Sequence, residues 1–370
     1  MRAAFVVSKQ PYGEIEDGET RITRLLVEAA AECCETVVVA LAEGRAREAP
    51  VEVVAVPKRP ARLAALAPRA ALRRRSLIHL RFSPDELARA LEGVAADVFV
   101  ARRAYMAEAA IAAGRVPPGS RLLVLVDVLE STVLRRRRSP LRPLLALEAR
   151  RTRRDELRCL RAASEVAYFS DSERTELGQA APAGPRLDLV LPPAAEPAPL
   201  SEPVAFFLGD RRWPPNAEAL AALLALWPRI AAAAPGARLL LAGHPGPGER
   251  DQGPAGVERL GFVPDLDAAL RSAAVLLAPV PIGGGVRVKV LDAARHGIPV
   301  VGSPEAIGSV AGYLPVAASA GEDEFVERAA TLLADRAAGR REGEALYAAN
   351  RELAGEGFVE RQVEALLTAA

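Results

Sequence analysis

Residues Val275–Val301 read VLLAPVPIGGGVRVKVLDAARHGIPVV, and this stretch decides the fold class. A short apolar run ends in prolines and three glycines. A helical pattern then runs to Gly297, and a second apolar run follows. Short apolar runs that alternate with helical segments are typical of a parallel sheet with crossover helices. The stretch therefore predicts a strand, a loop, a helix that opens at Val286, and a second strand.

The loop of this unit contains the residue types of an anion site. The glycines at 283–285 allow the backbone to approach a ligand closely, and the first amides of a helix suit a diphosphate. Arg287 and Lys289 add two cations beside that anion, and Asp292 is placed to accept hydrogen bonds from a ribose diol. The same residues also fit an ordinary strand–loop–helix connection, so the loop alone leaves both interpretations open.

The alternation of apolar and helical segments extends in both directions from this loop. It predicts two doubly wound α/β sheets, because six strands occur before a proline-rich segment at 180–203 and five occur after it. The expected strands of the first half are 3–8, 36–41, 51–56, 97–101, 121–127 and 165–170. Those of the second half are 204–208, 238–242, 257–260, 274–278 and 299–302.

The proline-rich segment predicts the domain organisation. We expect an N-terminal domain at 1–190, a second domain at 204–345, and a last helical segment at 346–370 that crosses back to the first domain. A chain of 370 residues is long for one core and suits two α/β domains.

Three motifs of the second half resemble the donor half of retaining GT-B glycosyltransferases of family four. They are PPNAEAL (Pro214 to Leu220), GFVPDL (Gly261 to Leu266) and the glycine loop with its helix. The first of them resembles a Pro-Asn-x-Glu-Ala-Leu signature of one branch. The first half is similar in Gly18 with the helix after it, in VDVLEST (126–132) and in YFSDSERTEL (168–177). The resemblance implies a GT-B fold, in which two Rossmann-like doubly wound domains face each other across a cleft.

The resemblance also implies roles on the donor side. Lys289 and Arg287 would hold the diphosphate, and Asp292 stands where the family has a ribose-binding glutamate with one methylene more. Gly284 stands where other members have a second glutamate, so the amides of Gly283, Gly284 and Gly285 would contact the sugar instead.

Further candidates follow two other strands of the second half. Gly209 ends the first of these strands, and Arg211 and Arg212 after it are candidates for the leaving diphosphate. His244 follows the next strand and would border the base. Asn216 is read either as a signature residue or as a helix cap.

On the acceptor side, the resemblance directs attention to the loop after the fifth strand. Asp127 is the first choice for activating the acceptor and Glu130 the second, although both also fit a capping role. Gly18 belongs to the expected first loop. Asp265 and Asp267 form an Asp-x-Asp pair, but acids also suit the start of a helix, so we expect no metal and no cofactor.

Composition excludes several classes of protein. The net charge is +1, from 48 basic and 47 acidic residues, which gives no sign of nucleic-acid binding. No apolar run is long enough to span a bilayer, so we expect a cytoplasmic protein. The three cysteines have no metal-ligand spacing. The arginine-rich segments at 73–75 and 135–138 are read as a solvated face, or as a patch for an anionic acceptor or an acidic membrane surface.

The sequence therefore predicts a bacterial, metal-independent, hexosyltransferase-like enzyme that uses a nucleotide diphosphate sugar and retains the anomeric configuration. The expected acceptor is a small molecule or a lipid-linked molecule. One alternative is an inactive, glycosyltransferase-like partner protein that binds nucleotide. A dinucleotide-dependent oxidoreductase is disfavoured, because SKQPYGEIEDG after the first strand lacks the G-x-G-x-x-G turn.

Overall fold

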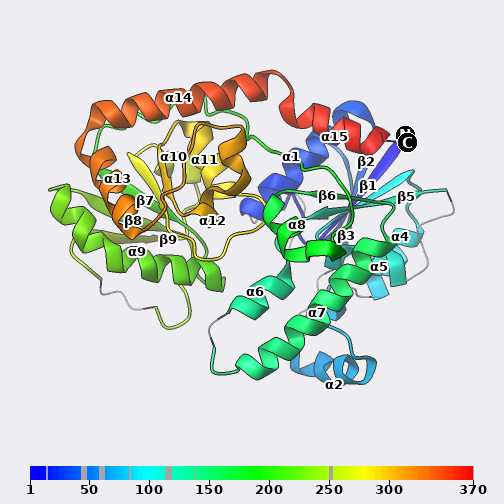
Figure 1. Cartoon of the computed structure of the whole chain (residues 1–370). Coiled ribbons are helices and arrows are strands. Elements are labelled where there is room, and N and C mark those ends of the chain that lie inside the picture. The colour runs from blue at the N-terminus through cyan, green and yellow to red at the C-terminus, as the bar shows by residue number, and fades with distance from the viewer. Residues whose placement is uncertain are drawn as a thin grey trace. The chain divides into compact units, whose positions relative to one another are not determined.

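The computed structural model describes residues 1–13, 16–42, 48–57, 63–82, 85–112, 119–137, 139–249 and 253–369. The chain divides into two compact units (Figure 1). Unit 1 comprises residues 1–188 and 359–370, and unit 2 comprises residues 189–358. Each unit is built around one parallel sheet.

The sheet of unit 1 has six parallel strands in the order β3-β2-β1-β4-β5-β6. Apart from the edge strand β3 (Glu52–Pro57), the strands are rich in Val, Ala and Leu and largely buried, as expected for a parallel sheet that is covered on both faces. Their bounds are Arg2–Val7 (β1), Glu35–Ala42 (β2), Glu52–Pro57 (β3), Val98–Arg102 (β4), Arg121–Val126 (β5) and Glu165–Tyr168 (β6).

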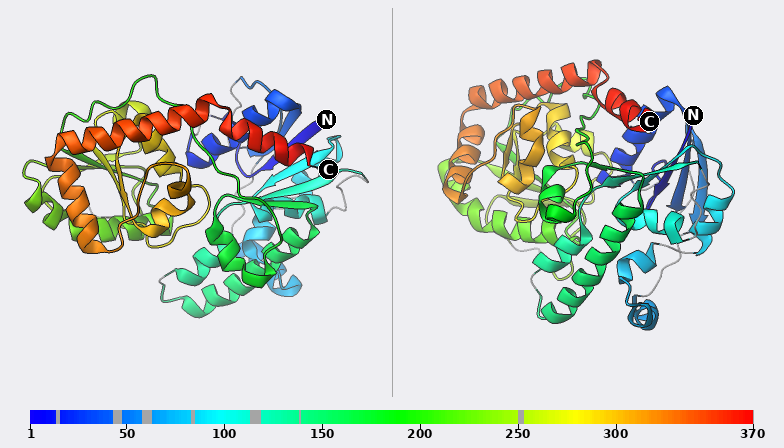
Figure 2. Two further views of the ribbon diagram at one scale, coloured as in Figure 1. Left: turned by 45° about the horizontal axis from the view of Figure 1, so that its top comes forward. Right: turned by 45° about the vertical axis from the view of Figure 1, so that its right-hand side comes forward.

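In the described residues before unit 2, eight helices connect or follow these strands. They are α1 (Gly18–Cys33), α2 (Leu63–Arg73), α3 (Leu77–Arg81), α4 (Asp85–Glu92), α5 (Ala104–Ala112), α6 (Glu130–Arg136), α7 (Arg142–Ala162) and α8 (Asp171–Leu177). The last helix, α15 (Phe358–Thr368), lies beside α1 and the first sheet in both views of Figure 2. Arg121 fixes its end, because its Nη2 donates to the carbonyls of Leu366 and Leu367 at 3.2 and 2.7 Å.

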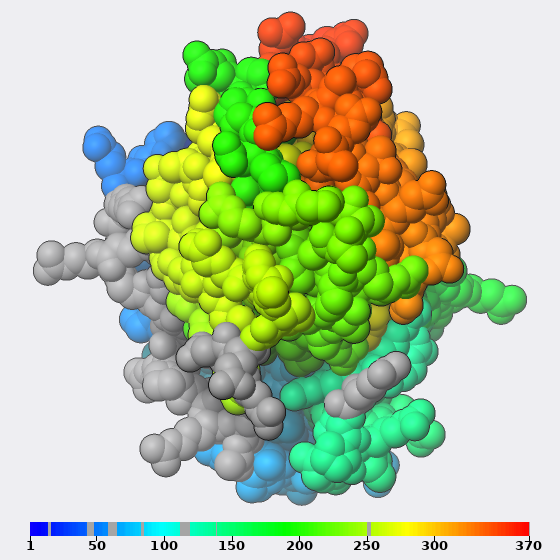
Figure 3. All heavy atoms as spheres, turned by 90° about the vertical axis from the view of Figure 1, so that its left-hand side faces the viewer, coloured from blue at the N-terminus to red at the C-terminus, as the bar shows by residue number. Residues whose placement is uncertain are grey.

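Unit 2 has five parallel strands in the order β11-β10-β7-β8-β9. These are Val204–Leu208 (β7), Arg238–Ala242 (β8), Val257–Gly261 (β9), Val275–Ala278 (β10) and Val300–Gly302 (β11). The helices are α9 (Pro214–Ala233), α10 (Leu266–Leu270), α11 (Val288–His296), α12 (Pro304–Ile307), α13 (Glu322–Ala334) and α14 (Arg336–Gly355). Figure 3 shows α9 and the orange α13 packed side by side on one face of this unit.

All eleven strands predicted from the sequence are present, within two residues at each end. The helix after the glycine loop differs from the prediction: it begins at Val288 rather than Val286, because Arg287 takes a non-helical conformation and forms the N-cap. In the proline-rich segment, Arg186 forms a single isolated bridge with Tyr168. Within the described residues, no helix is long and apolar enough to cross a membrane.

Candidate functional site

The candidate donor site lies at the carboxyl ends of β7, β8 and β10 in unit 2. The chain leaves β7 toward β8 on one side, whereas β10 lies on the other side of β7. Such a change of direction is the point where open α/β sheets bind ligands. The loops that begin at Gly209, Gly243 and Pro279 all start at this edge.

Lys289 is a cation at this edge that has no acidic partner among the described residues. It is partly buried in the second position of α11, with its ammonium 5.6 Å from the ring centroid of Phe207 on β7. Its Nζ donates to Oδ1 of Asn216 at 3.1 Å. No described carboxylate pairs with it, and burial lowers the pKa of Lys289 to about 8. An ammonium without a counterion at a helix N-terminus is unfavourable unless an anion binds there.

Asn216 holds Lys289 in place. Its Nδ2 donates to the carbonyl of Asp210 at 2.9 Å, while its Oδ1 accepts from Lys289. The amide thus connects the loop after β7 to the start of α11. Asn216 is not the N-cap, because α9 begins at Pro214 and Trp213 precedes it. Asn216 therefore does not cap α9 but connects Asp210 to Lys289.

Two glycines are required by close contacts at this edge. A Cβ on Gly209 would lie 2.8 Å from Cγ of Asn216, so a side chain there would displace the bridging amide. A Cβ on Gly283 would lie 2.1 Å from the carbonyl oxygen of Glu305 at α12. Gly285 has a φ of +61°, which a residue with a side chain rarely adopts. Gly284 lies between the last two, in the loop that precedes α11.

Arg287 and Asp292 are both buried. The Nη1 of Arg287 donates to the carbonyl of Gly285 at 2.8 Å, and its guanidinium lies against Gly308, where a Cβ would be 2.7 Å from Nη2. Arg287 therefore stabilises the glycine loop from inside. Asp292 is three residues after Lys289 in α11 and is 2% exposed.

The two arginines after β7 are placed differently from each other. Arg211 is 2% exposed and donates to Glu249 at 2.8 Å and to the carbonyls of Gly209 and Ala242. Its guanidinium is thus already used to hold the loops after β7 and β8 together. Arg212 is exposed and forms a bidentate pair with Asp210. Of the two, Arg212 is the one that a ligand can reach.

His244 lies in an aromatic pair at the same edge. It stacks on Phe262, with ring centroids 4.9 Å apart and an interplanar angle of 14°. Phe262 follows β9 and is 50% exposed. His244 is partly buried, so the exposed ring of Phe262 offers a flat apolar surface on which another ring can stack.

A second polar group lies at the carboxyl edge of the sheet in unit 1. Asp127 follows β5, is 5% exposed, and accepts from Nη2 of Arg102 at 3.1 Å. Glu130 accepts from Nη1 of Arg103 at 2.9 Å. Burial raises the pKa of Glu130, and Arg103 opposes that rise. Arg103 has a φ of +75°, an unfavourable conformation for a residue with a Cβ, which turns the chain immediately after β4.

The loop after β1 completes this group of charges. Lys9 pairs with Asp17 at 2.5 Å and with Glu19 at 3.1 Å, and Ser8 donates to Glu19 at 2.5 Å. Burial would raise the pKa of Glu19, but Arg103 and Lys9 together lower it below its usual range. Gly18 is the first residue of α1, between the N-cap Asp17 and Glu19.

Sequence reasoning missed Arg102, Arg103, Lys9 and Glu19. A usable signal was present, because charged residues lie directly at the end of buried β4 and directly after buried β1. Because the carboxyl ends of adjacent parallel strands meet at one edge of a sheet, this pattern could have predicted that these charges lie close together.

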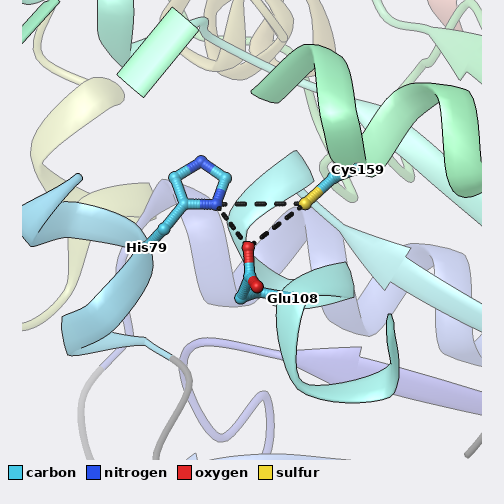
Figure 4. Close-up of side chains that lie close together, drawn as sticks. All are labelled: His79, Glu108 and Cys159. Carbon is cyan, nitrogen blue, oxygen red and sulfur yellow. Dashed lines mark hydrogen bonds and ion pairs between the residues drawn. The ribbon is translucent and has the colours of Figure 1, made fainter. Parts of the chain in front are cut away.

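The described residues contain one group with the ligand atoms of a metal site (Figure 4). His79 Nδ1 lies 3.2 Å from Oε2 of Glu108, and Sγ of Cys159 lies 3.5 Å from the same oxygen. Arg75 and Arg158 also pair with that oxygen. Burial would raise the pKa of Glu108, but its hydrogen bonds from His79, Arg158 and Arg75 lower it.

The ion pairs of Glu108 disfavour a bound metal ion among His79, Glu108 and Cys159. The carboxylate of Glu108 already balances guanidinium groups, and Arg75 also bonds the buried Asp155 at 3.0 Å. Burial raises the pKa of Cys159, so its thiol resists conversion to the thiolate that metals require. The group joins α3, α5 and α7 as a structural network.

The Asp-x-Asp pair of unit 2 is also occupied by protein partners. Asp265 caps α10 by accepting from the amide of Ala268 at 2.9 Å. Asp267 accepts from Arg295 at 2.7 Å and lies 3.2 Å from Nε2 of His296. Both carboxylates thus have roles in helix packing.

Comparisons with known proteins relate this chain to glycosyltransferases. The family described as glycosyl transferases group 1 matches residues 202–335. No curated protein matches the sequence significantly. Among solved structures, sucrose-phosphate synthase from Thermosynechococcus elongatus is 17% identical, with a TM-score of 0.73 over 100% of this chain and 99% of that one.

Two further structures share the fold over nearly their whole length. An α,α-trehalose-phosphate synthase (UDP-forming) from Burkholderia vietnamiensis is 12% identical, with a TM-score of 0.64 over 100% of both chains. HepE from Anabaena, in complex with UDP and glucose, is 16% identical, with a TM-score of 0.59 over 99% of this chain and 98% of that one. The chain thus has the GT-B glycosyltransferase fold, and its second unit carries the group 1 glycosyltransferase sequence pattern.

Proposed function

We propose that this protein transfers a sugar from a nucleoside diphosphate sugar to an acceptor. The observation that carries the proposal is Lys289, an ammonium without a carboxylate partner among the described residues, beside a glycine loop at the switch point of unit 2. A diphosphate would supply the missing negative charge. The group 1 match over residues 202–335 and the UDP complex of HepE support this choice of anion.

In the proposed reaction, the diphosphate leaves with its negative charge stabilised by Lys289 and by the first amides of α11. These groups are already in place before the reaction, so little reorganisation is needed when the charge develops. Asn216 keeps the ammonium oriented. Arg212 adds an exposed cation once it releases Asp210, whereas Arg287 and Arg211 support the loops from inside.

For the rest of the donor, we propose that the base stacks near His244 and Phe262 and that Asp292 accepts from the ribose. Asp292 is one methylene shorter than the family's glutamate, so the ribose has to lie closer to α11. We propose that the backbone at Gly283, Gly284 and Gly285 contacts the sugar. Metal is not needed in this scheme, and we propose retention of configuration from the resemblance to family four.

On the acceptor side, we propose that Glu130 and Asp127 orient the hydroxyl that attacks. Glu130 is the more accessible carboxylate, and its raised pKa makes it the better proton acceptor. Asp127 is buried against Arg102 and holds the loop after β5. The acceptor is proposed to be a small molecule or a lipid-linked molecule.

A thermal-shift series tests the donor site directly. We expect one of UDP, GDP, dTDP or ADP to raise the melting temperature, and NAD to leave it unchanged. Lys289→Met should lose the response. Arg238→Met, which removes an exposed cation elsewhere in unit 2, should keep it. If no nucleoside diphosphate stabilises the protein, the assignment of this loop as an anion-binding site is wrong. Stabilisation without sugar transfer would instead indicate the inactive partner protein.

A further inference from the structure

The first turns of α7 expose an unusual amount of apolar surface. Leu141, Leu144 and Leu147 are 58, 64 and 48% exposed, and they are three of the seven large apolar side chains exposed in the described residues. The N-terminal end of α7 points away from the strands of the first sheet in both Figure 1 and Figure 2. Clustered, exposed leucines mark interaction surfaces more often than single ones do.

Arginines surround these leucines. Residues 135–154 contain nine arginines and a single acid, Glu148. Glu148 accepts from the amide of Leu77 at 2.6 Å and from Ser76 Oγ at 3.1 Å, so it faces α3 rather than solvent. In the described part of this segment, four arginines form no ion pair: Arg137, Arg142, Arg150 and Arg151. Arg138 lies outside the described residues.

Helical spacing puts apolar and basic side chains on one stripe. Leu144, Leu147, Arg151 and Arg154 follow each other at intervals of three, four and three residues, which keeps them on one face of α7. Glu156 and Cys159 belong to the opposite, buried face. The outer face therefore combines leucines at its N-terminal end with cations in the turns that follow.

We propose that this leucine–arginine surface, formed by Leu141, Leu144, Leu147, Arg150 and Arg151, docks on an anionic lipid bilayer. Leucines enter the boundary between headgroups and acyl chains, while the guanidinium groups stay with the lipid phosphates. A soluble polyanion would satisfy the arginines but would leave the leucines in water. The surface thus fits a lipid surface better than an acidic polymer, whatever reaction the protein catalyses.

Vesicle cosedimentation of the whole protein tests this proposal. We expect binding to phosphatidylcholine vesicles that contain phosphatidylglycerol, weaker binding in high salt, and little binding to phosphatidylcholine alone. Leu144→Ser combined with Leu147→Ser should weaken binding by about tenfold for each leucine. Arg150→Ala combined with Arg151→Ala should weaken it roughly 30-fold.

The matched control removes two exposed arginines of α14, Arg340→Ala with Arg341→Ala, and should bind like the unmodified protein. Circular dichroism melts verify that each variant is folded. No binding to anionic vesicles would overturn the proposal. Equal loss in the α14 control would overturn it as well, because binding would then follow net charge. Binding to heparin and vesicles alike, unaffected by the leucine substitutions, would show a nonspecific polyanion site instead.

Discussion

Lys289→Met is expected to make the protein more stable and less able to bind a nucleoside diphosphate. The substitution keeps an unbranched side chain against the ring of Phe207 but removes the ammonium. Burial without an acidic partner lowers the pKa of Lys289 from 10.5 to about 8, which means that the folded state disfavours the charged form. Lys289 therefore lowers the free energy of unfolding when no ligand is bound.

The magnitude follows from that shift. A difference of one pKa unit corresponds to about 1.4 kcal/mol, so the shift from 10.5 to about 8 gives an upper limit of about 3 kcal/mol. Because Lys289 keeps some contact with solvent, we expect about 2 kcal/mol. The folded pKa is lower than the unfolded one, so the cost is fully present below pH 8. It fades as the pH rises from 8 toward 10.5.

Differential scanning calorimetry at several pH values measures both effects. At pH 7 the variant should melt about 4 to 8 °C above the unmodified protein. This difference should shrink as the pH approaches 10. Adding the nucleoside diphosphate that stabilises the unmodified protein should reverse the order, because only that protein has the cation to bind it.

Two results would refute this reasoning. If Lys289→Met lowers the melting temperature at pH 7, the ammonium is stabilised by a partner that the described contacts do not include. If the variant binds the diphosphate as tightly as the unmodified protein, Lys289 is not the anion-binding group. Arg238→Met serves as the control for removing a cation from unit 2.

Nucleoside diphosphate affinity, measured by calorimetry, should fall about tenfold between pH 7 and pH 9 as Lys289 loses its proton. Lys289→Arg should abolish this pH dependence. An affinity that does not change with pH in the unmodified protein would contradict the prediction. Asn216→Ala should weaken diphosphate binding about tenfold, since the hydrogen bond that orients the ammonium is lost; unchanged affinity would exclude a positioning role. Burial raises the pKa of Glu156 to about 7, so its carboxylate costs stability above pH 7 and not below its unfolded value of 4.5. Glu156→Gln should therefore stabilise the protein by about 2 kcal/mol at pH 8 but not at pH 4.5, and equal gains at both would be inconsistent with that titration. Asp127→Asn and Glu130→Gln should each slow sugar transfer at least about tenfold without changing nucleotide affinity; a parallel loss of affinity would show a folding defect.

The fold could be predicted from the sequence because its signals are local. Each strand is a short apolar run with a turn residue after it, as at Val204–Leu208 before Gly209, and strand bounds therefore agree closely. The start of α11 was misplaced by two residues. Its N-cap depends on the contact of Arg287 with Gly285 and Gly308, and Gly308 is distant in sequence.

The site was predictable only in part, because several of its contacts join residues that are distant in sequence. The sequence placed the cation Lys289 at the glycine loop. It did not show that Lys289 would donate a hydrogen bond to Asn216, 73 positions away. Arg211 and Arg212 are equivalent in sequence, yet one is buried against Glu249 and the other is exposed. Such differences depend on tertiary contacts, which spacing along the chain does not encode.

The most direct test of the central claim is release of nucleoside diphosphate from a panel of nucleotide sugars, in the presence of a cell extract that supplies acceptors. We predict release from one nucleotide sugar by the unmodified protein and by Arg238→Met, and its loss in Lys289→Met. The absence of release from every donor, although a nucleoside diphosphate still binds, would contradict the assignment as a glycosyltransferase.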